Sequence, residues 1–263
     1  MAERFDLFVD YCLASIINQT NKDFIYLIYF EKDLFPEYLA KMAELSSKYS
    51  FIHVEFVCGE EEFFARIGAD LLKYVDTDTK YIISSRIDND DALHKDAIAK
   101  IQHTFKPRSY DYAINLARGY RFVIEPEKII LKNNFFNGPF ISFVEKIKPK
   151  GEMKTVYCHK HEVFFLQERM VQVKDKYYWV QTIHNANLAN DLFGVPSMKL
   201  NRLRDFGFDY QGQVLSWMLY WQCFRLYFFN VRNYIPFVVK IEILKFIQKI
   251  KKKTAHLRRI DTT

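Results

Sequence analysis

A cluster of carboxylates follows an apolar segment in the first half of the chain. Asp88, Asp90 and Asp91 stand within four positions, directly after the strand-like residues 81–87. Neighbouring carboxylates repel one another and lose hydration when crowded, so proteins gather them most readily around a divalent cation. Oxygen ligands suit Mg²⁺ or Mn²⁺, and Mg²⁺ commonly takes further ligands from substrate phosphates. The cluster therefore predicts a metal-bound diphosphate.

A purely structural role for these side chains is the alternative. Asp90 or Asp91 would then cap a helix beginning near Ala92, and Asp88 or Asn89 would support the preceding turn. A cap uses only one side chain. Three carboxylates in four positions therefore favour a metal site.

The elements that must position the cluster alternate between helices and strands. Helical spacing of apolar residues predicts a first helix that ends before Asn18, and continuous apolar runs predict strands at residues 24–30, 51–57 and 81–87. Further helices are expected at residues 36–49 and 60–75 and after Leu93. Such an α/β series normally forms a mostly parallel sheet flanked by helices, which binds ligands beyond the carboxyl ends of its strands. The acidic cluster occupies such a position.

Composition places the chain among globular proteins of a reducing compartment. Its 263 residues are 49% hydrophobic, enough for one catalytic-size domain, which we expect at residues 1–210. The four cysteines show no C-x-x-C spacing, which argues against a disulfide framework or a zinc ribbon. The first ten residues carry four charges and no apolar core of signal-peptide length. A cytoplasmic location is therefore expected.

The remaining residues, 211–263, read as aromatic and basic amphipathic helices. Gln222 and Arg225 interrupt the aromatic stretch, so it is too polar to span a bilayer. From Lys240 onward, lysines and arginines alternate with aliphatic residues, as in helices that lie on an anionic membrane surface. A core helix followed by a solvated basic tail is the alternative. Nucleic-acid binding is not indicated, because the basic residues lack an accompanying recognition motif.

Four motifs carry a resemblance to a known family. Residues 12–24 (CLASIINQTNKDF) resemble the opening of nucleotide-sugar glycosyltransferases with a GT-A fold, and residues 86–93 resemble their D-x-D region. Residues 139–145 (PFISFVE) and 179–187 (WVQTIHNAN) are similar to motifs of the rhamnosyltransferase family within that group. The similarity extends over about residues 4–190. It implies a GT-A-like (Rossmann-like) fold and transfer of a sugar from a nucleoside diphosphate.

The resemblance assigns roles to the acidic cluster. In GT-A enzymes the D-x-D carboxylates hold a divalent ion that bridges the two phosphates of the sugar donor and stabilises the departing diphosphate. By resemblance, Asp88 and Asp90 bind Mn²⁺ or Mg²⁺, and Asp91 adjusts the loop or shares the ion. Arg86 would sit under the phosphates or pair with Asp88, since a charged residue that closes a buried strand needs a partner.

The predicted strand at residues 177–183 leads to further candidates. By resemblance, His184 is a third metal ligand, while Gln181 and Asn187 offer polar contacts to sugar or phosphate. A hydrogen-bonded histidine at a strand end is the alternative for His184. Trp179 would stack on a sugar face or pack in the core.

An inverting transfer also needs a base that takes the proton of the acceptor hydroxyl. Glu162 and Asp191 are the candidate carboxylates. We therefore expect a metal-dependent glycosyltransferase, with rhamnose as a candidate sugar, acting on a polysaccharide or lipid-linked acceptor at the inner face of the membrane. An inactive GT-A-like scaffold and a calcium-binding peripheral membrane protein are the alternatives.

The resemblance also implies a strand before the first helix. The sequence begins at that helix. Either this strand lies upstream of Met1, or the half of the fold that binds the nucleotide base lacks it.

Overall fold

The computed structural model describes most of the first 208 residues and a few positions beyond them: residues 2–33, 35–124, 129–136, 138–148, 153–160, 163–184, 194–197 and 200–208, with Trp217, Trp221, Phe224, Arg225 and Phe228. The chain divides into two compact units. Unit 1 comprises Met1–Tyr120, Asn134–Thr182 and Asn201–Tyr210, and unit 2 comprises Arg121–Asn133, Ile183–Leu200 and Gln211–Thr263. The acidic cluster belongs to unit 1. The predicted boundary at residue 210 stays a prediction.

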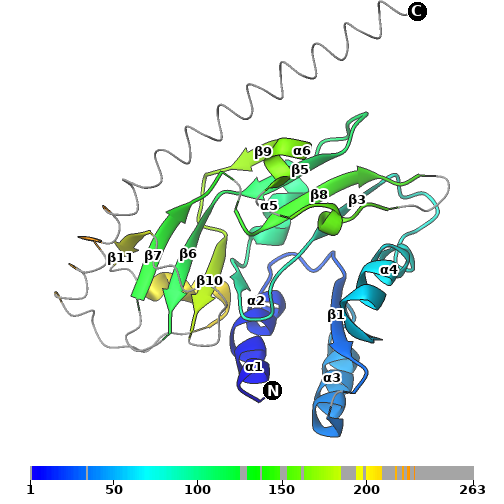
Figure 1. Ribbon diagram of the computed structural model, residues 1–263, viewed down its shortest axis with the longest axis horizontal. Helices are drawn as coiled ribbons and strands as arrows, with labels where there is room; N and C mark the ends of the chain where they lie inside the picture. The colour runs from blue at the N-terminus through cyan, green and yellow to red at the C-terminus, as the bar shows by residue number, and fades with distance from the viewer. Residues whose placement is uncertain are drawn as a thin grey trace, which may run out of the picture. The chain divides into compact units, whose positions relative to one another are not determined.

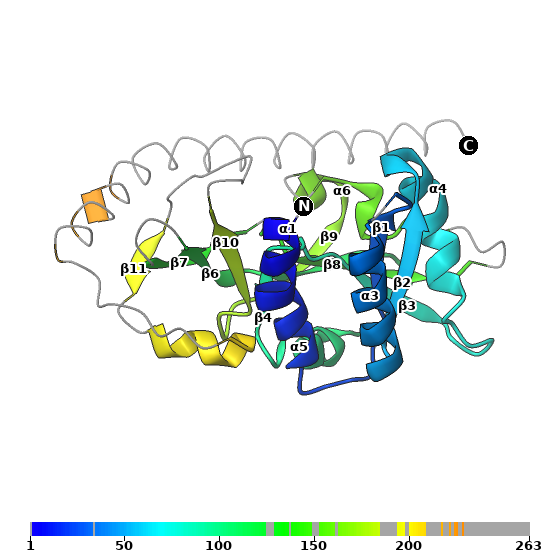
Figure 2. The same cartoon turned by 90° about the horizontal axis from the view of Figure 1, so that it is seen from below.

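Unit 1 begins with a continuous helical segment. It consists of α1 (Ala2–Leu7), a π-helical turn (Phe8–Leu13) and α2 (Ala14–Ile17). The segment ends at Asn18, as the sequence predicts. Its apolar side packs against α3 (Pro36–Lys48), which lies beside α1 in Figure 2, and the rings of Phe5 and Tyr38 are 4.6 Å apart.

Two parallel strands form a separate small sheet. β1 (Tyr26–Glu31) pairs with β2 (Ile52–Val57), and α3 provides the crossover that a parallel pair requires. The helix α4 (Gly59–Leu72) follows β2, and acidic residues in its first turn complement the helix dipole.

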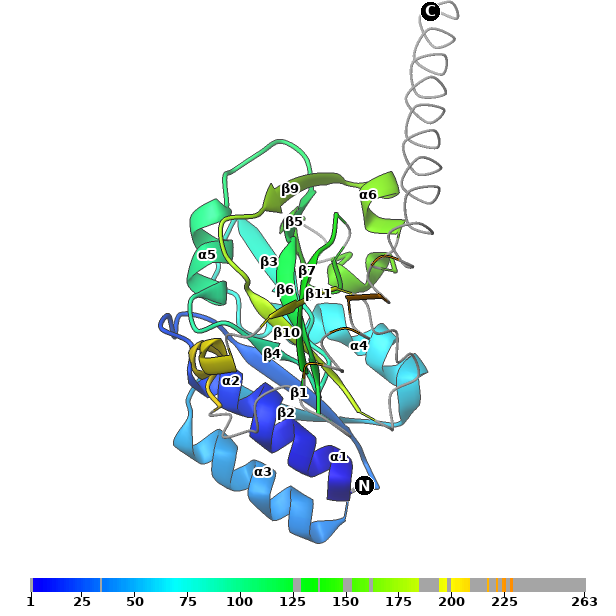
Figure 3. The same ribbon diagram turned by 90° about the vertical axis from the view of Figure 1, so that its left-hand side faces the viewer.

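Four further strands of unit 1 form a mixed sheet, in the order β3-β8-β5-β9. β8 (Ile141–Lys146) runs antiparallel to both β3 (Tyr81–Ser85) and β5 (Tyr112–Leu116), whereas β9 (Arg169–Val173) runs parallel to β5. The strands lie side by side in Figure 1. Figure 3 shows α4 and α5 (Ala97–Thr104) on opposite sides of β3.

Shorter elements lie wholly or mainly in unit 1: β4 (Ala92–Leu93), β10 (Trp179–Ile183), α6 (Phe164–Gln167) and two 3-10 helices, Val156–Cys158 and Leu200–Phe206. The strand β6 (Arg118–Val123) has residues 118–120 in unit 1 and residues 121–123 in unit 2. β10 pairs antiparallel with β4, placing Trp179 opposite Leu93. In unit 2, β11 (Val195–Ser197) pairs antiparallel with β7 (Ile129–Asn134).

The α/β class is confirmed, but the expectation of a mostly parallel sheet is wrong. Only β1-β2 and β5-β9 are parallel pairs among those described here. The first half of the chain has the expected alternation of strands and helices. The second half supplies β8 and β10 without long helical crossovers, and antiparallel pairs need none.

The aromatic core is centred on Trp179, which is fully buried. Its indole Nε1 donates a hydrogen bond to the carbonyl of Leu116 at 2.6 Å, and its ring stacks with Phe135 and Phe140. A Cβ on Gly119 would lie 1.9 Å from the indole, so only glycine fits there. Trp179 is therefore a core residue. Of the two roles expected from the sequence, packing in the core is confirmed and stacking on a sugar face is wrong.

No helix among the described residues combines the length and apolar character needed to cross a membrane.

Candidate functional site

The acidic cluster lies in the loop that leaves the carboxyl end of β3, as the sequence predicts. The three carboxylates differ in exposure: the Asp88 side chain is 55% exposed, Asp90 is half-buried and Asp91 is buried. The backbone amide of Asp91 donates a hydrogen bond to the carbonyl of Asp88 at 3.1 Å and so closes a turn. The loop therefore presents Asp88 to solvent and draws Asp91 inward.

Thr182 anchors this loop to β10. Its backbone amide donates to the Asp91 carboxylate at 3.0 Å, and its hydroxyl donates to the carbonyl of Asp90 at 2.5 Å. The Asp91 carboxylate thus satisfies a buried backbone amide. Its position is fixed by a strand that lies 91 residues away in sequence.

The helix-cap explanation of the cluster is wrong. The residues after Asp91 form the short strand β4, and the next helix, α5, begins only at Ala97. Asp96 occupies the N-cap position of that helix. None of the clustered carboxylates is therefore consumed in capping it.

The polar residues of the 12–24 motif hold the segment that follows the acidic loop. The side-chain amide of Gln19 donates to the carbonyls of Ser15 at 3.0 Å and His94 at 2.9 Å, and its oxygen accepts from the amide of Ile98 at 3.1 Å. The Ser15 hydroxyl accepts from the amide of Leu93 at 3.1 Å. Gln19 and Ser15 are buried, so these bonds fix β4 and the start of α5. The sequence identifies residues 12–24 as a motif shared with GT-A glycosyltransferases, but it does not reveal that Gln19 and Ser15 hold β4 and α5.

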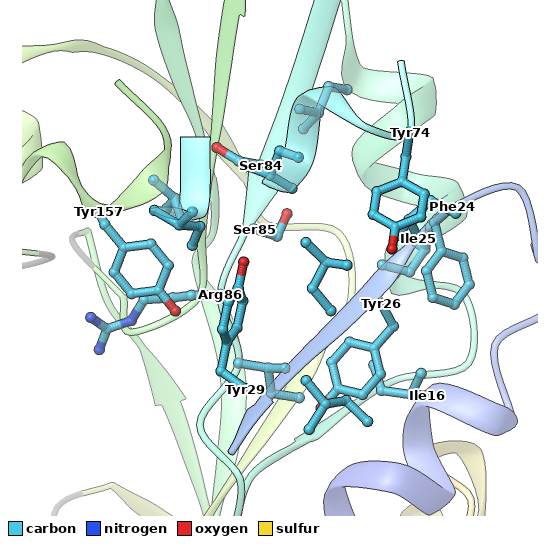
Figure 4. A pocket seen from close by; sticks show the side chains of 18 of the residues that line it. Ile16, Phe24, Ile25, Tyr26, Tyr29, Tyr74, Ser84, Ser85, Arg86 and Tyr157 are labelled. Carbon is cyan, nitrogen blue, oxygen red and sulfur yellow. The ribbon is translucent and has the colours of Figure 1, made fainter. Parts of the chain in front are cut away.

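A basic and a phenolic side chain lie beside the exposed part of the loop. The guanidinium of Arg86 is 3.8 Å from the Asp88 carboxylate. Figure 4 shows Tyr157 next to Arg86. Burial raises the pKa of Tyr157, the positive charge of Arg86 opposes that rise, and the negative charge of Asp88 adds to it. The sequence does not single out Tyr157, because nothing in its local pattern marks its proximity to Arg86.

A buried thiol lies close to the carboxylates. Cys12 is fully buried and its sulfur is 3.3 Å from the hydroxyl of Tyr26. Burial raises the pKa of Cys12 to about 12, and the negative charges of Asp88, Asp90 and Asp91 contribute in the same direction. A thiol with so high a pKa stays protonated and is a poor nucleophile. Cys12 is therefore a packing residue beneath the loop.

The loop offers few ligands to a metal ion by itself. In the described part of the chain, no three His, Cys, Asp or Glu side chains are grouped closely enough to hold one. Asp88 and Asp90 nevertheless supply hard oxygens on a partly exposed loop. Mg²⁺ is commonly bound by one or two carboxylates together with waters and substrate phosphates. The donor set therefore fits an ion shared with a diphosphate.

The structure describes only two of the other five predicted site residues. His184 is buried and belongs to unit 2, and Gln181 is half-buried on β10. Glu162, Asn187 and Asp191 lie outside the described residues. The roles of these five residues stay predictions.

Comparison with protein families gives a match over most of the chain. A family model described as "Putative rhamnosyl transferase" matches residues 1–195 of the 263-residue chain. No curated protein and no solved structure matches the chain. The matched region contains the acidic loop, β10 and the motifs at residues 12–24 and 139–145. The chain belongs to the glycosyltransferase family described as "Putative rhamnosyl transferase".

Proposed function

We propose that this glycosyltransferase uses a divalent cation to transfer a sugar from a nucleoside-diphosphate donor to a glycan or lipid-linked acceptor. The observation that carries the proposal is that the three carboxylates of the acidic loop differ in burial and hydrogen bonding. Asp91 is buried and hydrogen-bonded, whereas Asp88 faces solvent and Asp90 is half-buried. A loop held at one carboxylate can present the others at a fixed place, as a GT-A-like enzyme requires.

Asp88 and Asp90 are the residues that would hold Mn²⁺ or Mg²⁺. When bound, the ion supplies positive charge at the diphosphate as negative charge grows on the leaving group. Arg86 adds a guanidinium beside Asp88, and this group suits recognition of phosphate oxygens. The Thr182 and Gln19 hydrogen bonds hold the loop and the segment after it, so little ordering of the backbone is needed on binding.

The residues outside this loop enter the proposal through the family resemblance. His184 is proposed as a further ligand to the ion, and Gln181 and Asn187 as contacts to the sugar or the phosphates. Glu162 and Asp191 are the proposed bases for the acceptor hydroxyl. Rhamnose is the sugar that the family's description suggests.

Thermal stabilisation by ligands tests the metal site directly. A ligand that binds only the native state raises its apparent stability. We expect nucleoside diphosphates to raise the Tm in the presence of Mn²⁺ and to have little effect after chelation. Asp88→Ala and Asp90→Ala should abolish the Mn²⁺-dependent increase, whereas Asp78→Ala, an exposed aspartate outside the loop, should retain it. Stabilisation that is insensitive to Mn²⁺ and to the loop substitutions would contradict the proposed metal site.

A membrane-surface acceptor is supported by side chains in the last fifth of the chain. Trp217, Trp221 and Phe228 are 72%, 49% and 58% exposed. Tryptophan side chains favour the boundary between headgroups and acyl chains. The basic residues after Lys240 would add attraction to anionic lipid. We propose that the protein acts as a peripheral protein on the cytoplasmic face of a membrane.

A further inference from the structure

The motif at residues 139–145 places two polar side chains on β8, Ser142 and Glu145. Ser142 is buried, and its hydroxyl oxygen is 2.6 Å from that of Ser85, the last residue of β3. Arg86 and the acidic loop follow Ser85 directly. Ser142 therefore fixes the point at which this loop leaves the sheet.

Glu145 holds a different segment of unit 1. Its side chain is buried, and its two carboxylate oxygens accept hydrogen bonds from the backbone amides of Lys154 and Thr155, each at 2.8 Å. A buried carboxylate needs such donors, and here both come from consecutive residues of one segment. Glu145 thus fastens residues 154 and 155 to the end of β8.

Thr155 has a backbone conformation that residues with a Cβ rarely adopt. Its φ is 57° and its ψ is 174°, in a region that belongs almost entirely to glycine. Glycine would adopt this conformation without strain, but threonine adds a hydroxyl. That hydroxyl accepts a hydrogen bond from the amide of Tyr157 at 3.2 Å and so caps the 3-10 helix Val156–Cys158. The bonds to Glu145 hold the strained backbone where Thr155 can cap the helix.

These contacts determine where Tyr157 lies. Its ring packs edge-on against that of Phe63 on α4, with 5.0 Å between the centroids, and its side chain lies next to Arg86 in Figure 4. Burial has the largest effect on the pKa of Tyr157 and raises it, while Arg86 lowers it and Asp88 raises it. Within the described part of the chain, the phenolic hydroxyl forms no hydrogen bond. Its proton is therefore available to a ligand bound beside Arg86.

We propose that Tyr157 binds the sugar donor, its hydroxyl donating a hydrogen bond to a phosphate oxygen of the nucleoside diphosphate, and that Glu145 is the residue that positions Tyr157. The inference rests on the proposed function, because it assigns a further contact to the same diphosphate. A neutral phenol adds a directional hydrogen bond beside the cation of Arg86 without adding charge. Glu145 acts only through Thr155 and Tyr157 and does not touch the ligand.

Tyr157→Phe tests the contact, because it removes only the hydroxyl and keeps the ring that packs against Phe63. Isothermal titration calorimetry with Mn²⁺ and each of GDP, UDP and dTDP identifies the nucleotide that the unmodified protein binds most tightly. The Kd of that nucleotide should rise about tenfold or more in Tyr157→Phe, since a hydrogen bond to a charged group is lost. The Tm without nucleotide should stay unchanged.

Glu145→Gln tests the positioning role, because its amide group faces one of the two backbone N–H donors with a donor of its own. The Kd should rise about fivefold or more, but should rise little further when Tyr157 is already phenylalanine. Thr155→Ala should weaken binding in the same way, and Thr155→Ser should restore most of the loss. The Thr155 pair carries the test if Glu145→Gln does not fold. Asp111→Asn, which releases the side chain of Lys154 but not its amide, is the control and should leave the Kd unchanged.

The position of Tyr157 is measured without any ligand by ¹⁹F NMR, with 3-fluorotyrosine at residue 157. Glu145→Gln and Thr155→Ala should shift or broaden its resonance, and Asp111→Asn should not. An unchanged resonance in the first two variants, or independent effects of Glu145→Gln and Tyr157→Phe on the Kd, would overturn the positioning role. Tight Mn²⁺-dependent binding by Tyr157→Phe would overturn the contact alone. Absence of Mn²⁺-dependent binding by the unmodified protein would overturn the proposed function together with it.

Discussion

The backbone amide of Thr182 donates a hydrogen bond to the carboxylate of Asp91 at 3.0 Å. This contact ties the acidic loop after β3 to β10. It also gives different roles to two aspartates that look equivalent in the sequence. Asp91 supports the loop, and Asp88, three positions earlier, remains exposed.

Replacing Asp91 should therefore reduce stability. In Asp91→Ala the buried amide of Thr182 loses its acceptor, which costs roughly 1–3 kcal/mol of unfolding free energy. Urea denaturation followed by circular dichroism measures the difference. Asp88→Ala is the matched control and should change the unfolding free energy by less than about 0.5 kcal/mol, because its side chain is exposed. Equal effects of the two substitutions would refute the separate role of Asp91.

Gln19 should be needed for the order of the segment that follows the loop. Gln19→Ala removes three hydrogen bonds and leaves the amide of Ile98 and two carbonyls to find new partners. We expect a loss of about 2 kcal/mol or more in unfolding free energy. Ser47→Ala, which removes one exposed hydrogen bond, serves as the control and should have little effect. A Gln19 variant as stable as this control would show that the network does not hold the segment.

The contact between Gly119 and Trp179 predicts opposite effects for two glycine substitutions. Gly119→Ala places a Cβ within 1.9 Å of the indole, so the core must rearrange at a cost of about 1–3 kcal/mol or more. Gly68→Ala, inside α4, meets no atom closer than 3.7 Å and should gain about 0.5–1 kcal/mol from helix propensity. Thermal unfolding of both variants checks the sign of each change. A neutral Gly119→Ala would contradict the close packing.

Glu62 should titrate at unusually low pH. Its carboxylate accepts a hydrogen bond from the amide of Cys58, and further bonds from Lys32 and Arg66, which together lower its pKa to about 2. Because the pKa is lower in the folded protein, the stabilising contribution is present above the ordinary value near 4.5 and is lost as the pH falls toward 2. Carboxyl chemical shifts measured against pH give the pKa directly. A midpoint near 4.5 would show that these bonds are not formed in solution.

Tryptophan fluorescence should report membrane binding. The chain has three tryptophans, and Trp179 is buried, so a blue shift on adding anionic vesicles would come from Trp217 and Trp221. Replacing both with alanine should remove the shift and weaken binding. Phe35→Ala, at an aromatic side chain that is 58% exposed elsewhere, should bind normally. Truncation of residues 240–263 should reduce binding more at low salt than at high salt. Vesicle binding that survives both changes would argue against this surface.

The sequence predicted the first half of the fold well. The runs at residues 24–30, 51–57 and 81–87 correspond to β1, β2 and β3. These apolar runs have the length of strands and are too short for typical helices. The position of the acidic cluster at the end of β3 followed from the same pattern.

The second half was not predictable in this way. β8 pairs with both β3 and β5, and such long-range antiparallel registers depend on tertiary packing rather than on local patterns. For the same reason the sequence could not tell the buried Asp91 from the exposed Asp88, since the difference arises from Thr182 on β10. Tyr157 was missed because nothing in its local sequence marks its proximity to Arg86.

The anchoring of Asp91 also bears on the order in which ligands add. In the proposed metal site, Asp88 and Asp90 are the carboxylates that would hold the cation, while Asp91 is engaged by Thr182. One or two carboxylates commonly hold Mg²⁺ together with waters and substrate oxygens. We therefore expect the cation to behave as a co-substrate that enters together with the nucleotide. In steady-state kinetics, the concentration of Mn²⁺ that gives half-maximal rate should then fall as the donor concentration rises.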